Sequence, residues 1–279
     1  MGPQTLQCVK LRLLVRFSVN GVLTVAFVGL KNIPVADADG ITSAIFEMLS
    51  GYLNMEKDAV ALKLVGFGCD GASVNLGKKT GVVKKLKEQL HEGIIDIHCM
   101  AHRLELAYKD TMKDVGLYKK LEELLTLLYS FYHKSAKNRS ELKTIFERLG
   151  TATAIPPRIG GTRWVAFLLN ALQVLFKGYK AFLLHMQEVN IKENQSGFCL
   201  IFYFSFQLQD SRCDRSAKAL GICRILKNEP LIQFALFMRD ILQLLVKISL
   251  MAQKATSTVA DVYETLSTVM STIASFINR

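Results

Sequence analysis

The sequence predicts an α/β fold in the first part of the chain and a helical fold in the rest. Short runs rich in Val, Ile, Leu and Phe alternate with helical patterns up to about residue 111, as in an α/β sheet. After that point apolar residues recur with helical spacing. Pro156-Pro157 and Gly160-Gly161 mark a break, so we expect domains at residues 1–155 and 156–279.

The chain begins with a predicted hairpin and helix. Two β-rich runs, residues 9–19 and 22–30, are joined by Asn20-Gly21. This pair is a strong hairpin signal because both turn residues must adopt positive φ. Asp37 or Asp39 can cap a helix over residues 41–53, whose apolar positions recur every three or four residues.

The central stretch has two predicted strands, at residues 62–67 and 94–97, each followed by a helix. We expect both strands to lie parallel in one mixed sheet that also contains the hairpin, because crossover connections are right-handed. Asp70 follows the first strand, and Cys99 and His102 follow the second. The carboxyl ends of parallel strands carry the chemistry of such sheets, so these three residues should meet at one edge.

Helical patterns then cover residues 101–111, 117–132, 140–149 and 162–189. A later stripe is predicted to be packing core, at Phe234, Phe237, Ile241, Leu244, Leu245 and Ile248. Residues 195–210 are aromatic and β-prone, and we expect this atypical segment to be weakly ordered.

Three segments carry a family resemblance. GFGCDGASVNLGKKTG, IHCMAHRLELAYKD and GGTRWVAFLLNAL resemble the hAT superfamily of DNA transposases, especially transposase-derived vertebrate proteins described as zinc-finger or SUMO-ligase-like. The resemblance covers roughly residues 14–189 and weakens from residue 216 onward. It implies an incomplete RNase H-like core, a mixed sheet lacking its first strand, followed by an all-α insertion domain. The chain would then be a family member truncated at both ends.

The resemblance implies that Asp70 is a remnant of a magnesium site. Two divalent cations stabilise the attacking and leaving oxygens on this fold, and three acids are needed to hold them. The chain matches only one of these positions, so we expect a catalytically inactive, transposase-derived protein with no cofactor. Mg²⁺ would be required only if activity were retained. The alternatives are an active or complex-assisted transposase, a SUMO-ligase-like protein, and a product without a selected function.

Each motif residue also has a structural interpretation. Asp70 is a favoured turn former, and Cys99 with His102 supplies only half of a zinc site. The resemblance instead places Cys99 and His102 at the rim of the active site, with DNA contacts. Trp164, beside Arg163, either packs in the core or stacks on an unpaired base, as the family's Arg-Trp pair implies.

The composition suits a polyanionic partner. Lys and Arg exceed Asp and Glu by 11, and the sequence pI is about 9.4. The densest basic cluster lies between residues 78 and 87, where Lys84 and Lys87 are predicted phosphate contacts on one helix face. A solvated helix face is the alternative. DNA is the expected partner, with protein partners or self-association as further candidates.

The compartment is predicted from cysteines and apolar runs. The six cysteines show no C-x2-C pair, which favours reduced thiols and an intracellular protein. Gln4, Gln7 and Lys10 interrupt any signal peptide, and residues 198–208 are too short to span a membrane. We therefore expect no membrane partner, and the family resemblance implies a nuclear location.

Overall fold

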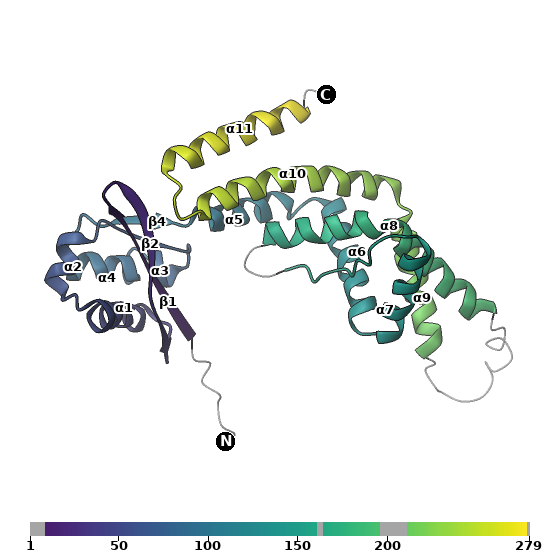
Figure 1. The fold of residues 1–279 in the computed structure, drawn as a ribbon, viewed down its shortest axis with the longest axis horizontal. Coiled ribbons are helices and arrows are strands. Elements are labelled where there is room, and N and C mark those ends of the chain that lie inside the picture. The colour runs from purple at the N-terminus through teal and green to yellow at the C-terminus, as the bar shows by residue number, and fades with distance from the viewer. Residues whose placement is uncertain (1–8, 161–163, 196–210, 278–279) are drawn as a thin grey trace, which may run out of the picture. The chain divides into compact units, whose positions relative to one another are not determined.

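A computed structural model describes residues 9–160, 164–195 and 211–277, which form a mixed α/β structure that is mostly helical (Figure 1). The elements follow in this order: β1 (Val9–Val19), β2 (Val22–Ile33), α1 (Ala38–Leu53), α2 (Lys57–Lys63), β3 (Gly66–Cys69), α3 (Ser73–Leu76), α4 (Val82–Gln89), β4 (Ile95–His98), α5 (Met100–Met112), α6 (Gly116–His133), α7 (Ala136–Arg148), α8 (Trp164–Gln195), α9 (Ser211–Leu226), α10 (Glu229–Gln253) and α11 (Val259–Ile277). The atypical segment at 195–210 lies outside the described residues, apart from Gln195 at the end of α8.

The described residues fall into two compact units. The α/β unit comprises those of Met1–Leu106 together with Ile248–Met270. The helical unit comprises those of Ala107–Lys247 together with Ser271–Arg279. The domain boundary expected at residue 155 stays a prediction. The division into compact units does not test where an inserted domain begins.

The hairpin is confirmed. Asn20 and Gly21 have φ values of 50° and 78°, as a two-residue hairpin turn requires. The strands pair antiparallel from Val19↔Val22 outward, and β2 extends to Ile33. The register passes from Leu13↔Gly29 to Leu14↔Phe27, which leaves Val28 as the extra residue of a β-bulge.

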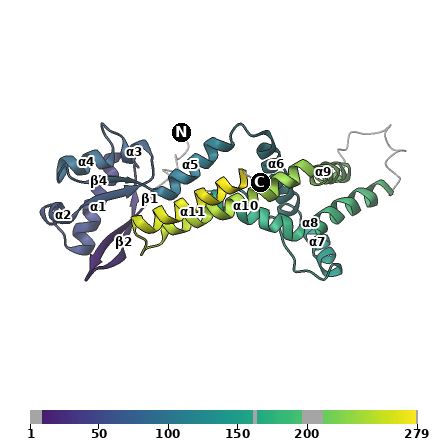
Figure 2. The ribbon, with the colours of Figure 1, turned by 90° about the horizontal axis from the view of Figure 1, so that it is seen from above.

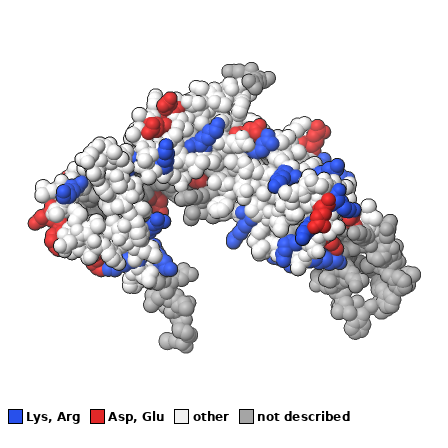
Figure 3. All heavy atoms as spheres, viewed as in Figure 1, with Lys and Arg blue, Asp and Glu red and all other residues white. Residues whose placement is uncertain are grey.

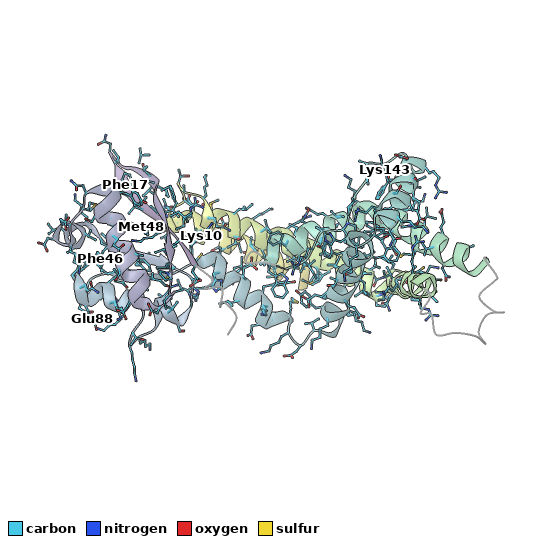
Figure 4. All side chains as sticks on the ribbon, turned by 90° about the horizontal axis from the view of Figure 1, so that it is seen from below. Lys10, Phe17, Phe46, Met48, Glu88 and Lys143 are labelled. Carbon is cyan, nitrogen blue, oxygen red and sulfur yellow. The ribbon has the colours of Figure 1, made fainter. Side chains whose placement is uncertain are left out.

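Helix α1 covers one face of this hairpin, the inner face (Figure 2). Asp37 caps the helix by accepting a hydrogen bond from the Gly40 N–H at 2.7 Å. Buried residues of α1 pack with Leu11 and Leu13 of β1 in one core cluster. Figure 4 labels Met48 on this helix. The helix approaches so closely that a Cβ on Gly29 would lie 2.6 Å from the Tyr52 ring.

The single mixed sheet is a wrong prediction for the described residues. The hairpin forms one two-stranded sheet, and β3 with β4 forms another. The first central strand begins later than predicted, because Leu62 and Lys63 end helix α2 and β3 starts at Gly66. Two of its four residues are glycines, which have no side chain to hold a strand against a neighbour. The parallel pairing of β3 with β4 is as predicted, and β4 starts one residue late at Ile95.

The helical unit is built around long side chains that α6, α7 and α8 bury. Tyr132, Phe146 and Phe182 are the largest of its fully buried residues. Gly178 lets α8 come close to α7, since a Cβ there would lie 3.1 Å from the Phe146 ring. Figures 1 and 2 both show α6, α7, α8 and α9 gathered together.

One helix of the described residues is long and apolar enough to cross a membrane. It is the stretch Trp164–Ile191 of α8. Its residues Leu168, Leu172 and Phe182 are each 0% exposed in the core of the helical unit. Core helices of globular domains pass the same test, so this feature gives only weak support for a membrane span.

Candidate functional site

The edge of the β3–β4 pair brings the predicted motif residues together. Cys69 pairs with His98 at the last position of the parallel register, so Asp70 and Cys99 both follow at this edge. The Cys99 N–H donates to the Cys69 carbonyl at 2.8 Å. His102 lies in the first turn of α5, with its ring centroid 5.6 Å from that of His98.

Asp70 shapes the turn that leaves β3. One carboxylate oxygen, Oδ1, accepts hydrogen bonds from the Ala72 N–H at 3.2 Å and from the Asn75 amide at 2.7 Å. Gly71 lies against the His98 ring, where a Cβ would come within 2.4 Å of Cε1. These contacts agree with the turn-forming interpretation of Asp70.

The donor set at this edge does not fit a magnesium pair. Burial, followed by the charges of Asp70 and Asp96, raises the pKa of Cys69 to about 11, so its thiol stays protonated at neutral pH. In the described part of the chain no group of three His, Cys, Asp or Glu side chains is placed to hold a metal ion.

The predicted phosphate contacts on α4 are engaged with acids. Lys84 lies 3.5 Å from both Glu88 and Glu92, and Lys87 lies 3.4 Å from Asp96. The acids in these pairs offset the positive charge of Lys84 and Lys87 on this face of α4. A phosphate would have to compete with the neighbouring carboxylates, so a nucleic-acid role for Lys84 and Lys87 stays a prediction with a weaker basis.

The Arg-Trp pair is only partly described. Arg163 lies outside the described residues. Trp164 is half-buried against the helical core, and the Lys109 ammonium lies 5.5 Å from the centre of its ring. Its indole Nε1 is buried without a hydrogen-bond partner among the described residues. These contacts favour the packing interpretation, and base stacking stays a prediction.

The excess positive charge belongs almost entirely to the helical unit. Residues of the α/β unit include thirteen Lys and Arg against twelve Asp and Glu. The described residues of the helical unit include twenty Lys and Arg against eleven acids. Figure 3 shows Lys and Arg at several places over the helical unit on one face of the molecule. The sequence pattern does not reveal this imbalance, because the basic residues of the helical unit are spread over several helices and form no dense run.

Two basic pairs lie on packed helices of this unit. Lys177 and Lys180 are exposed on α8, and Arg224 and Lys227 are exposed at the end of α9. The Tyr179 hydroxyl donates to the Leu226 carbonyl at 2.6 Å, so the two pairs flank a point where these helices touch. Among the described residues, none of the four makes an ion pair with an acid, unlike Lys84 and Lys87.

A buried polar network joins four helices of the same unit. His185 is 1% exposed. Its Nδ1 accepts a hydrogen bond from the Tyr132 hydroxyl, and its Nε2 lies 3.0 Å from the Glu141 carboxylate. Arg215 forms an ion pair with Glu141 and donates to the Asn138 amide oxygen at 2.8 Å. The network is well suited to fixing the packing of α6, α7, α8 and α9. A histidine within an apolar helical run was its only sequence signal.

Comparison with known proteins adds no family assignment. A scan against protein-family models finds no match for this chain, and no solved structure matches it.

Proposed function

We propose that this chain is a hAT transposase-derived nuclear protein that binds nucleic acid without cleaving it. The motif resemblance supports the origin, with an RNase H-like core expected in the α/β unit. The parallel β3–β4 pair is consistent with that expectation, since it carries Asp70 and Cys99 at one edge. The observation that carries the binding function is the excess of basic residues in the helical unit.

The basic pairs on α8 and α9 are the best-placed phosphate contacts in this unit. The sequence has no acid between Trp164 and Gln187, or between Arg215 and Asn228. A polyanion approaching Lys177, Lys180, Arg224 and Lys227 therefore meets no carboxylate from the same stretch of either helix. Phosphate contacts of this kind release counterions, which makes binding tighter at low salt and independent of sequence.

The absence of cleavage follows from the chemistry of the acids. One oxygen of the Asp70 carboxylate accepts hydrogen bonds in a turn, and a single acid does not hold two metal ions for phosphodiester cleavage. A protein of this kind would retain the affinity for nucleic acid and lose the reaction.

The test compares two double variants that each remove two positive charges. Lys177→Gln with Lys180→Gln removes an unpaired set, and Lys84→Gln with Lys87→Gln removes a set paired with acids. Affinity for a fluorescent 20-base-pair duplex is measured by anisotropy over a series of salt concentrations. If both α8 lysines contact phosphate, the negative slope of log K against log salt should become shallower by about 2 in the first variant. The second variant should retain the slope of the parent chain.

Equal losses in the two variants would show that net charge alone governs binding, and would contradict the assignment to α8. Binding that is undetectable, or insensitive to salt, would remove the nucleic-acid function and leave protein interaction as the alternative.

A further inference from the structure

Among the described residues, the face of the hairpin opposite α1, called here the outer face, has mostly exposed side chains, and only its Arg16 reaches a segment outside the hairpin, at the Ser257 carbonyl. Residues directly opposite each other in an antiparallel pair share a face, so the outer face is formed by Arg12 with Leu30, Leu14 with Phe27, Arg16 with Val25, and Lys10 with Asn32. The β-bulge at Val28 keeps Phe27 on this face. Lys31 on the inner face forms an ion pair with Glu47 of α1, which agrees with this division.

The outer face is apolar at its centre. Leu14, Val25, Phe27 and Leu30 are 47%, 36%, 57% and 52% exposed. By contrast, Leu11 and Leu13 of the inner face are half-buried against the core beneath α1. Contiguous exposed apolar side chains of this kind mark an interaction surface.

The outer face is also cationic. No Asp or Glu occurs between Val9 and Ile33, while Lys10, Arg12 and Arg16 alternate along β1 on this face. The Arg12 guanidinium lies 5.4 Å from the centre of the Phe27 ring, and Arg16 donates to the Ser257 carbonyl. Figure 4 labels Lys10 on this hairpin. A complementary occupant must therefore combine apolar and acidic side chains.

We propose that the outer face docks an acidic amphipathic helix of a partner protein. A ribbon of two strands about 5 Å apart offers a width that suits one helix of about 10 Å diameter. The same ribbon already holds α1 in this way on its inner face. Single-stranded nucleic acid suits the surface less well, because Phe27 is its only aromatic residue and the other central side chains are aliphatic. A second copy of the hairpin would bring together like charges.

The test uses the full chain and two synthetic helical peptides with identical leucine spacing, one with Glu and one with Lys on the polar face. The acidic peptide should bind and the basic peptide should not, as measured by fluorescence anisotropy. Phe27→Asn should weaken binding about tenfold or more. Val22→Asn is the matched control, because Val22 is 64% exposed on the same hairpin but pairs with Val19 on the other face. It should leave binding within about twofold of the parent.

A charge reversal gives a result that misfolding cannot mimic. Lys10→Glu with Arg12→Glu should abolish binding of the acidic peptide and create binding of the basic one. Equal binding of the two peptides, or no effect of Phe27→Asn, would overturn the proposal. Binding of oligo-dT, or self-association of the chain, that is lost in Phe27→Asn would also overturn it, and would assign the face to nucleic acid or to a second copy.

Discussion

Acidification should destabilise the helical unit through His185. Burial lowers the pKa of this imidazole below its ordinary value of 6.5, although the hydrogen bond to Glu141 opposes the effect. The unfolded chain therefore takes up the proton first as the pH falls. Stability from this residue is fully present above pH 6.5 and is lost as the pH falls toward the folded-state pKa. The slope is at most about 1.4 kcal/mol per pH unit for one proton.

Glu141 should extend the loss of stability of the helical unit to more acidic pH. Burial raises the pKa of this carboxyl, but the hydrogen bond from His185 and the charge of Arg215 outweigh burial and leave the pKa below its ordinary value of 4.5. Its contribution to stability is present above pH 4.5 and lost below it. The free energy of unfolding should thus decline first below pH 6.5 and again below pH 4.5.

The assay is urea unfolding followed by the fluorescence of Trp164, the sole tryptophan, which lies in the helical unit. His185→Gln keeps a donor and an acceptor but does not titrate, so it should flatten the dependence between pH 7 and pH 5. His133→Gln is the control because His133 is exposed. Titration of His185 would not be the cause of the destabilisation if His185→Gln kept the slope of the parent, or if the control flattened it equally.

Three further predictions concern packing and reactivity. Phe182→Ala should cost about 3–5 kcal/mol in urea unfolding, because the side chain is 0% exposed and leaves a cavity. Gly29→Ala should cost less than about 1 kcal/mol in the same measurement, because the Tyr52 ring that its methyl group would meet at 2.6 Å is 64% exposed and can turn away. Cys69, with a pKa of about 11 and a half-buried thiol, should react with iodoacetamide at pH 8 more slowly than the exposed Cys99, as followed by peptide mass spectrometry.

Local signals predicted the hairpin and the first helix correctly. The turn at Asn20-Gly21 depends only on the φ preferences of two adjacent residues. The cap at Asp37 likewise depends on a neighbour three residues away. Such features depend on short stretches of sequence, so they could be predicted without knowledge of the tertiary structure.

Non-local pairing was the part that sequence patterns could not provide. The run at residues 62–67 is apolar enough for a strand, but its start completes a helical turn instead, with Leu62 88% exposed. A short apolar run does not indicate which strand it will pair with. The expected pairing of this strand with the hairpin is absent from the described residues.

The phase of an apolar helix was equally hard to predict. The expected stripe on α10 included Phe237, which is 49% exposed. The predicted Ile248 is buried, and the predicted Phe234 and Leu245 pack half-buried against the core, but the most deeply buried positions also include Leu231, Ala235, Met238 and Leu242, which the stripe left out. A helix that is apolar on most sides has no unique amphipathic phase, so its buried face is decided by packing partners.

The most direct test of the proposed function is one assay that separates binding from cleavage. The full chain is incubated with a labelled duplex and with a hairpin DNA in Mg²⁺ or Mn²⁺, and each sample is run on native and denaturing gels. The account predicts retarded DNA on the native gel and intact strands on the denaturing gel, with Asp70→Asn behaving as the parent does. Metal-dependent nicking that Asp70→Asn abolishes would contradict it.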